Sequence, residues 1–588
     1  MFLNKINKAF TVFRQFWGIL SKKFKIQFVL IFFVILIGSL LETLGVSVLL
    51  PFINAILQPE KLMNHEYVKP ILQFLNISDS KRFVIAVSLM VAVFYIIKNL
   101  YQILSQYWQS KFRANLQAYI SETILTAYLY RPYSFFLDTN SSILLRNVIN
   151  DADGIMTCVT SMFQIITTTF VILFMFIFLF LTDAMLAGGL CISAIVVLTG
   201  SIFTLGRPLR NSGESLRQTG AICYKTCTQA FQGIKEIIVG HKENFFSNEY
   251  KKAYDKKNSF DVKKCVLEYI PARLIEAVCL SVLVMLVAFI VVTERVVSDV
   301  MIANLGAFAV AAFKLLPAVS ALSSNFNTFI VQYTALTSVY TNLEEAKHYF
   351  SKNGNEEISF NDNILIKDIT FAYEKNPDKL ILNKSNAEIN KGDVIGIKGS
   401  SGSGKTTCVD ILLGLLEPKN GQILIDNKKL SDANINSWRN KISYVPQTAY
   451  LIDDTIRANI AFGIPEKDID DERVKNAIKE AMLDDYLNTL PEKEMTVVGE
   501  RGVQMSGGQR QRLSIARALY TNPSIIIFDE ATSALDEITE KEIMKSIDNL
   551  IGQKTLIIIA HRLSTLKKCN KIFEVKDGQI NVSENITE

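Results

Sequence analysis

The segment Gly399-Ser-Ser-Gly402-Ser-Gly404-Lys405-Thr406 lies between the apolar run 394–397 and the helix-like stretch 408–413. A strand, a glycine-rich turn and a helix start in this order predict a phosphate-binding loop. The glycines let successive backbone N–H groups close on a polyphosphate, and the helix N-terminus adds partial positive charge. The specificity of the pattern disfavours the alternative, a flexible glycine loop without a ligand.

The side chains of this loop have distinct expected roles. Lys405 is expected to reach the outer phosphates of ATP, and Thr406 to hold Mg²⁺. The other loop residues expected to bind the nucleotide are Gly399, Ser400, Ser401, Gly402, Ser403, Gly404 and Thr407.

Two carboxylates end a second apolar run, Ile525-Ile-Ile-Phe528-Asp529-Glu530. A continuous apolar run of this length is typical of a strand that is buried on both faces. We expect Asp529 to join the Mg²⁺ shell and Glu530 to orient or deprotonate the attacking water. The sequence therefore predicts an ATP hydrolase with ATP and Mg²⁺ as its cofactors.

Further motifs follow in the order found in ABC ATPases, and the chain resembles that family. Met505-Ser506-Gly507-Gly508-Gln509 is similar to the family signature, usually Leu-Ser-Gly-Gly-Gln, and methionine is close to leucine in volume. The resemblance implies that Ser506, Gly507, Gly508 and Gln509 contact ATP bound to the opposite chain of a dimer. In the X-loop-like segment 496–502, Val497 stands where an acidic residue is usual, which leaves that contact with the transport domain open.

The same resemblance assigns roles to four single residues. Tyr373 resembles the aromatic residue that stacks on adenine, and Asp536 ends a D-loop-like segment that contributes to nucleotide binding. Gln447 resembles the Q-loop glutamine, which links Mg²⁺ and the attacking water to the transport domain, and His561 resembles the switch histidine that senses the γ-phosphate. Glu530, His561 and Gln447 are the expected catalytic residues, and Thr406, Gln447 and Asp529 the expected metal site.

A large apolar excess lies in the first part of the chain. Of the 588 residues 49% are apolar, and before about residue 330 the runs exceed the ~18 residues that mark a membrane helix. Six spans are predicted, near 26–57, 83–108, 162–181, 185–205, 267–293 and 301–329. The segment 207–264 is rich in Lys and Arg and belongs in the cytosol by the positive-inside rule. The net charge of +5 therefore reflects topology and does not indicate a nucleic-acid partner.

The predicted fold class is an α-helical six-span transmembrane domain followed by an α/β P-loop ABC ATPase domain. The expected domains are an amphipathic elbow helix at 1–25, the transmembrane domain at 26–339, a linker at 340–355 and the nucleotide-binding domain at 356–588. Segments 131–136 and 230–239 resemble the coupling regions of ABC exporters. This layout is similar to that of a type IV ABC half-transporter.

One phosphate-binding loop and one signature per chain imply a homodimer with two equivalent ATP sites. A heterodimer stays open, although Glu530 and His561 give no sign of the degenerate site that many heterodimers carry. The resemblance to bacterial exporters implies a multi-pass protein of the bacterial inner (plasma) membrane with a cytosolic ATPase domain.

Four charged residues mark a candidate substrate site. Lys98, Lys314 and Glu42 lie inside apolar spans, and Arg273 lies at the inner end of the fifth span. A charge in a membrane costs several kcal/mol unless it is paired or faces water, so such residues are functional candidates. The alternative is structural pairing, of Glu42 with either lysine. Arg273 would then pair with Glu276, three residues further along its helix.

The segments 41–52 and 314–317 look like those of bacterial flippases that move polyprenyl-pyrophosphate-linked oligosaccharides, which are thought to hold the pyrophosphate with cavity cations. Lys98 and Lys314 stand where arginines are expected, and Lys makes a point contact where Arg makes a bidentate one. The sequence therefore favours ATP-driven flipping of such a substrate, with membrane lipid and the lipid-linked substrate as partners. Export of another lipid, a drug or a peptide stays open, as does an ATP-gated channel or a regulatory receptor.

Overall fold

The computed structural model describes residues 2–63, 69, 79–182, 184–293, 299–350, 354, 356–499, 502–531, 537–560 and 566–584. By its internal contacts the chain divides into two units. The first comprises Met1–Tyr130 and Thr139–Lys347, and the second Arg131–Asp138 and His348–Glu588. The sequence-based limits of the elbow, transmembrane domain, linker and ATPase domain stay predictions.

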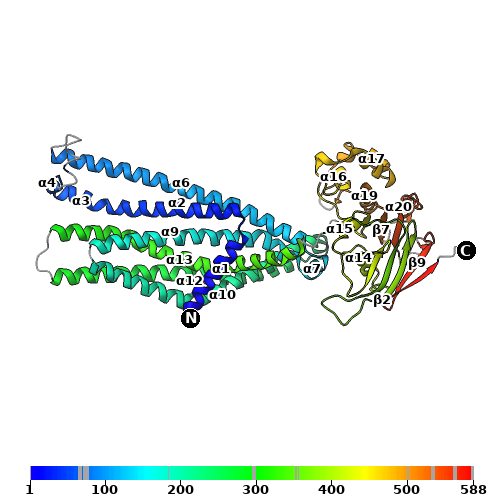
Figure 1. The fold of residues 1–588 in the computed structure, drawn as a ribbon, viewed down its shortest axis with the longest axis horizontal. Coiled ribbons are helices and arrows are strands. Elements are labelled where there is room, and N and C mark those ends of the chain that lie inside the picture. Colours follow the sequence, from blue (N-terminus) through cyan, green and yellow to red (C-terminus); the bar gives the residue numbers. More distant parts are fainter. Residues whose placement is uncertain are drawn as a thin grey trace. The chain divides into compact units, whose positions relative to one another are not determined.

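The first unit consists of helices, several of them long (Figure 1). In chain order these are α1 (Phe2–Ile19), α2 (Lys22–Ser47), α3 (Leu49–Leu57), α4 (Pro59–Met63), α6 (Ser80–Leu129), α8 (Ser141–Arg146), the π-helix η1 (Asn147–Asp151), α9 (Ala152–Thr182), α10 (Ala184–Gln232), α11 (Ile234–Val239), α12 (Glu243–Thr293) and α13 (Asp299–Phe350).

Several of these helices are long and apolar enough to cross a membrane. Among the described residues, four stretches meet this criterion: Lys22–Ile56, Ser80–Leu129, Ser141–Leu181 and Ala187–Gln232. They contain the first four predicted spans nearly whole. The fifth and sixth predicted spans fall in α12 and α13, which are continuous helices of 51 and 52 residues, and stay predictions.

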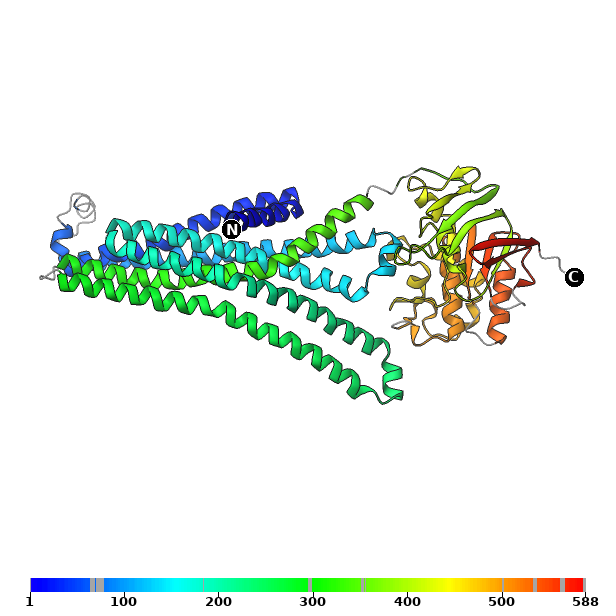
Figure 2. The ribbon, with the colours of Figure 1, turned by 90° about the horizontal axis from the view of Figure 1, so that it is seen from below.

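The helices α10 and α12 pack along each other and are joined through α11 (Figure 2). Toward α11 this hairpin diverges from the other helices of the unit. Both helices contain an internal proline, Pro208 and Pro271, which removes a backbone N–H from each helical ladder. At the α11 end Phe231 and Val239 expose 75% and 74% of their surface, within the segment predicted as a coupling region.

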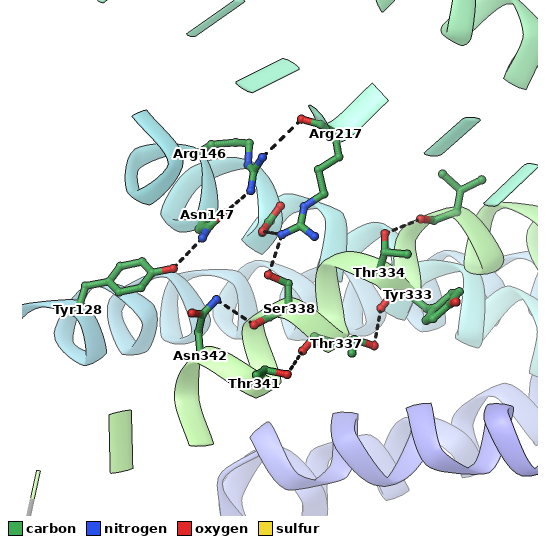
Figure 3. Close-up of polar contacts among 12 residues, drawn as sticks. Tyr128, Arg146, Asn147, Arg217, Tyr333, Thr334, Thr337, Ser338, Thr341 and Asn342 are labelled. Carbon is green, nitrogen blue, oxygen red and sulfur yellow. Dashed lines mark hydrogen bonds and ion pairs between the residues drawn. The ribbon is translucent and has the colours of Figure 1, made fainter. Parts of the chain in front are cut away.

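A polar cluster joins four elements of the first unit (Figure 3). Arg217 of α10 donates to Asp151 of η1 at 2.6 Å and to Ser338 of α13 at 2.7 Å. Asn147 of η1 donates to the Tyr128 hydroxyl of α6 at 2.7 Å. Because Asp151 and Asn147 are buried, these bonds satisfy groups that would otherwise lose solvent contacts without replacement.

The second unit contains two sheets. A four-stranded antiparallel sheet has the order β2-β1-β4-β5, and a six-stranded, mostly parallel sheet has the order β10-β9-β3-β8-β7-β6. The strands are β1 (Asn363–Phe371), β2 (Leu382–Asn390), β3 (Val394–Lys398), β4 (Asn420–Ile425), β5 (Lys428–Lys429), β6 (Ile442–Val445), β7 (Ile525–Asp529), β8 (Thr555–Ile559), β9 (Lys571–Lys576) and β10 (Gln579–Glu584). Every residue of β7 and β8 is buried, as the apolar run at 525–528 predicts.

This unit also contains helices. They are α7 (Tyr133–Asp138), α14 (Lys405–Leu412), α15 (Ile435–Arg439), α16 (Ile456–Ile460), η2 (Glu466–Asp468), α17 (Asp471–Glu480), α18 (Asp484–Asn488), η3 (Lys493–Met495), α19 (Gly507–Tyr520) and α20 (Glu537–Asp548). Trp438 of α15 is fully buried, and its indole N–H donates to the backbone carbonyl of Leu412 in α14 at 2.8 Å. The short helix α7 groups with this unit through contacts that include the Asp138–Lys375 ion pair at 2.6 Å.

Candidate functional site

The glycine-rich loop connects β3 to α14. Three of its glycines have a positive φ: Gly399 (+153°), Gly402 (+75°) and Gly404 (+107°). A Cβ at position 399 would lie 2.5 Å from a backbone carbonyl oxygen, so this path of the chain requires glycine. The ammonium group of Lys405 donates to the carbonyl oxygens of Gly399 and Ser400 at 3.0 Å each, which closes the loop around the lysine.

Polar groups of the loop fit a phosphate and a metal ion. The Oγ atom of Ser403 is buried and has no hydrogen-bond partner in the described part of the chain. Thr406 is exposed in the first turn of α14, and Ser400, Ser401 and Gly402 are exposed in the loop. A phosphate would satisfy the orphaned hydroxyl and the free N–H groups of the helix start. These groups fit a bound nucleotide, in which Lys405 would be the residue for the outer phosphates and Thr406 the residue for Mg²⁺.

The predicted adenine-stacking residue lies beside this loop. The hydroxyl groups of Tyr373 and Thr407 are 2.9 Å apart, and Thr407 follows Thr406 in α14. The ring of Tyr373 also packs edge-on against Phe371, with centroids 5.1 Å apart. The structure thus brings this aromatic residue and the helix that follows the loop together, and adenine stacking stays a prediction.

The catalytic carboxylate candidate, Glu530, lies beside another residue that the sequence singles out, Gln447. Asp529 ends β7, and Glu530 follows with a left-handed φ of +45°, which is uncommon for a residue with a side chain. The side-chain amide of Gln447 donates to Glu530 Oε2 at 2.8 Å. Because β3, β8 and β7 run parallel, their carboxyl ends lie at the same edge of the sheet as the glycine loop.

Two polar residues near this edge were not predicted from the sequence. The Tyr444 hydroxyl donates to Asp529 Oδ2 at 2.8 Å, and Asp410 lies buried in α14, one turn after Thr406. Burial, with the negative charge of Asp529, raises the pKa of Asp410 to about 6. Burial also raises the pKa of Asp529, and the hydrogen bond from Tyr444 opposes that rise. The sequence offered one signal for Asp410: it lies four residues after Thr406 and therefore on the same side of the helix.

The signature residues begin α19. The hydroxyl of Ser506 accepts the backbone N–H of Gln509 at 3.2 Å, and the Gln509 side chain accepts the backbone N–H of Ser506 at 2.7 Å. This reciprocal capping fixes the helix start. Gly507 and Gly508 form the first positions of the helix, and Met505 is buried in the core at the position where leucine is usual.

The structure adds little on three further residues that the sequence singles out. Asp536 and His561 lie outside the described residues. Val497, at the position where an acidic residue is usual, exposes 49% of its surface. The roles expected for the first two therefore stay predictions.

The structure brings three of the four candidate substrate residues together. Glu42 of α2 accepts from Lys98 of α6 at 2.7 Å and from Lys314 of α13 at 2.8 Å, and we call these three residues the membrane charge cluster. Gln102 of α6 adds a hydrogen bond to Glu42 at 2.7 Å. The Lys98 side chain is 5% exposed, whereas that of Lys314 is 45% exposed. The cluster contains two cations and one carboxylate.

Arg273 forms a separate pair. Its guanidinium contacts Glu276 at 2.6 Å and stacks on the ring of Tyr269 at 4.7 Å from the centroid. Both charged side chains are more than half exposed. Each candidate cation thus contacts a carboxylate. Structural pairing, the alternative to a substrate site, requires these contacts.

The fold and the site together define a class: a membrane-helix protein that carries a P-loop nucleotide-hydrolysing domain. Family models support the same division. The model of the ABC transporter transmembrane region matches residues 28–315, and the ABC transporter model matches residues 382–533. The chain therefore belongs to the ABC transporters with transmembrane and ATPase domains, and its ATP hydrolysis is coupled to transport.

Similar proteins agree with this assignment. An ATP-dependent lipid A-core flippase of Ralstonia nicotianae is 28% identical over 480 residues, which cover 80% of this chain and 78% of the relative. A leukotoxin translocation ATP-binding protein of Mannheimia glucosida is 47% identical over 218 residues, 37% of this chain and 30% of the relative. The structure of a bacterial Atm1-family ABC exporter with ATP bound has a TM-score of 0.77, 22% identity and 95% coverage of both chains. The predicted fold class is confirmed.

Proposed function

We propose that this chain is an ATP-driven flippase for a lipid-linked anionic substrate, best matched by a polyprenyl-pyrophosphate-linked oligosaccharide. The observation that carries this proposal is the membrane charge cluster, which holds two lysines against one carboxylate. Its surplus positive charge is associated with Lys314, the more exposed of the two ammonium groups. A charged headgroup that enters the membrane domain would be stabilised by such a cation.

The ATP site supplies the driving force in this proposal. The glycine loop binds the phosphates, Asp529 and Thr406 hold Mg²⁺, and Glu530 positions the water with support from Gln447. The proposed assembly is a homodimer, since half-transporters of this family are typically dimeric and a chain with one loop and one signature can complete two sites only with a second copy. The proposed location is the bacterial inner membrane, with the ATPase domain in the cytosol.

The names of the relatives leave more than one substrate class open. One relative is named for flipping of lipid A-core, and another for translocation of a leukotoxin. A lipid-linked substrate is favoured here because the cluster places charge inside apolar helices, where an apolar drug would gain nothing from it. Export of another lipid, a drug or a peptide is the alternative.

The substrate proposal is tested by Lys314→Ala in vesicles that contain polyprenyl-pyrophosphate-linked oligosaccharide. Flipping is expected to fall much more than ATP hydrolysis, and Lys314→Arg should retain most of it, because a cation remains in place. Lys252→Ala is the matched control, because Lys252 forms an exposed ion pair with Glu249 in the α12 hairpin arm. That control should leave flipping unchanged.

A purely structural cluster gives the opposite pattern. Lys314→Ala would then lower the melting temperature through a poorly balanced Glu42, and adding Glu42→Gln would restore both stability and flipping. That restoration would remove the case for an anionic substrate, and the alternative exporters would take its place.

The homodimer is tested with Ser506→Arg. A bulky cation at the start of α19 should block closure onto the nucleotide of the partner chain, so hydrolysis should be abolished although the glycine loop is unchanged. Mixing variant and wild-type chains should lower activity below the wild-type fraction. Full hydrolysis by the variant alone would contradict a composite site.

A further inference from the structure

Tyr444 lies in β6, the strand at one edge of the six-stranded sheet. β6 and β7 are parallel neighbours, and Tyr444 lies opposite Ile527. Since side chains alternate along a strand, Asp529, two residues beyond Ile527, points to the same face as Tyr444. The phenol reaches along this face, and its hydroxyl donates to Asp529 Oδ2 at 2.8 Å.

The ring of Tyr444 is not part of the hydrophobic core. Tyr444 exposes 37% of its surface, whereas Ile442 and Val445 of the same strand are buried in the core clusters. A residue kept only for packing would not leave more than a third of its surface exposed while its hydroxyl donates to a buried carboxylate. The contact with Asp529 is therefore the feature of Tyr444 that needs an explanation.

The two oxygens of Asp529 have different surroundings. Oδ2 accepts the Tyr444 hydroxyl, while Oδ1 accepts no hydrogen bond from the described part of the chain. Carboxylate oxygens that are held on one side by a hydrogen bond present a fixed second oxygen to a metal shell. Oδ1 is thus the oxygen available to Mg²⁺ or to a water that the metal holds.

The segment after Tyr444 serves the neighbouring carboxylate. Gln447, three residues later, donates to Glu530 Oε2 at 2.8 Å. Between them, the carbonyl of Pro446 accepts from Gln511 of α19 at 3.1 Å, which ties the segment to the signature helix. One short stretch therefore contacts the metal carboxylate, the hydrolytic carboxylate and the helix that begins with the signature.

We propose that Tyr444 is a positioning residue of the metal site: its hydroxyl fixes one oxygen of Asp529 so that the other faces the Mg²⁺ shell. Tyr444 touches neither nucleotide nor metal in this role and acts through Asp529. Its loss should loosen metal binding without altering nucleotide binding in the absence of metal.

The test is Tyr444→Phe in the full-length protein in nanodiscs, with Mn²⁺ as a spectroscopic probe. Electron paramagnetic resonance titration in the presence of ATP should show Mn²⁺ binding weakened about tenfold to a hundredfold, the loss typical of a metal ligand that is deprived of its outer-shell partner. The Mg²⁺ concentration for half-maximal hydrolysis should rise by the same factor, and saturating Mg²⁺ should recover most of the maximal rate. Affinity for a fluorescent ATP analogue in EDTA should stay at the wild-type value.

Tyr520→Phe is the matched control. It also removes a phenol hydroxyl from the ATPase unit, one that accepts the backbone N–H of Asp470 at 3.0 Å instead of donating to the metal carboxylate. It should lower the melting temperature and leave the Mn²⁺ titration unchanged. A Tyr444→Phe variant that behaves in the same way would overturn the proposal, because the hydroxyl would then be structural only.

A double variant identifies the partner through which Tyr444 acts. In an Asp529→Ala background, Tyr444→Phe should cause no further weakening of Mn²⁺ binding. Additive losses would show that the phenol acts elsewhere and would also overturn the proposal.

Discussion

The membrane charge cluster and the carboxylates of the ATP site both contain buried charged side chains. They differ in the sign of the charges that surround each carboxylate. In the cluster, Glu42 lies between two lysines contributed by other helices. At the ATP site, Asp410, Asp529 and Glu530 place like charges near one another, and the pKa of Asp410 rises to about 6 as a result of burial and the charge of Asp529. In the first arrangement the chain itself supplies the opposite charge, whereas the second is suited to a cation that comes with the nucleotide.

This difference separates the effects expected from substitutions. A substitution at the ATP site should alter ATP hydrolysis more than the stability of the fold, because the carboxylates there gain their opposite charge only when a cation binds. A change at Lys98 should alter stability as well, because this lysine is buried against Glu42.

The largest effect is expected for Glu530→Gln. The amide is isosteric but cannot take a proton from water, so steady-state ATP hydrolysis should fall at least about a hundredfold while ATP binding is retained. Phosphate release and filter-bound ATP measure the two quantities. Near-normal turnover would show that Glu530 is not the hydrolytic carboxylate.

Lys98→Met probes the membrane charge cluster. Lys98 is the buried partner of Glu42, so its replacement removes one hydrogen-bonded ion pair and leaves the carboxylate with Lys314 and Gln102, which should destabilise the unit by about 2 kcal/mol. Thermal unfolding in detergent measures the loss, and adding Glu42→Gln should recover part of it. If Lys98→Met melts like the wild type, the buried pair is not a stabilising element.

Asp393→Asn tests a balanced carboxylate inside the ATPase unit. Burial alone would raise the pKa of Asp393, but the ion pair with Lys571 and hydrogen bonds from Asn390 and Asn570 lower it on balance. A lowered folded-state pKa gives stability that is present above the unfolded pKa and is lost as pH falls through the folded one. The variant should therefore lose on the order of 1 kcal/mol at pH 7, and the gap to the wild type should close below about pH 4. A gap that is constant with pH would exclude the charge as its cause.

Arg273→Ala should have the smallest effect on stability. Its pair with Glu276 is exposed on both sides, and such pairs contribute about 0.5 kcal/mol or less. Flipping of the lipid-linked substrate should still fall if Arg273 contacts the headgroup. Unchanged flipping together with unchanged melting would remove Arg273 from the substrate site.

Sequence reasoning located the ATP site because its motifs are local. The glycine loop, the carboxylates after a buried strand and the signature each form within a few residues, so their spacing alone indicates their geometry. Tyr444 was missed because its role depends on which residue of β7 lies opposite it, and strand register is a long-range property.

The charged residues in the spans show the same limit. Their positions within apolar helices could be read directly, but the rotation of α2, α6 and α13 decides which charges meet. Both interpretations were therefore open for Glu42, and the structure shows one carboxylate shared by two lysines. Arg273 pairs within its own helix, at a spacing that the sequence does indicate.

Trp438 gives this protein an optical reporter of its own. The chain has three tryptophans, and Trp438 is the single one in the ATPase unit. Its indole N–H is bonded to the carbonyl of Leu412 at the end of the helix that begins with Lys405. A shift of that helix on loading of the glycine loop would change the polarity and hydrogen bonding of the indole, and hence its emission. With Trp17 and Trp108 replaced by phenylalanine, ligand-dependent motion of α14 becomes visible without any attached dye.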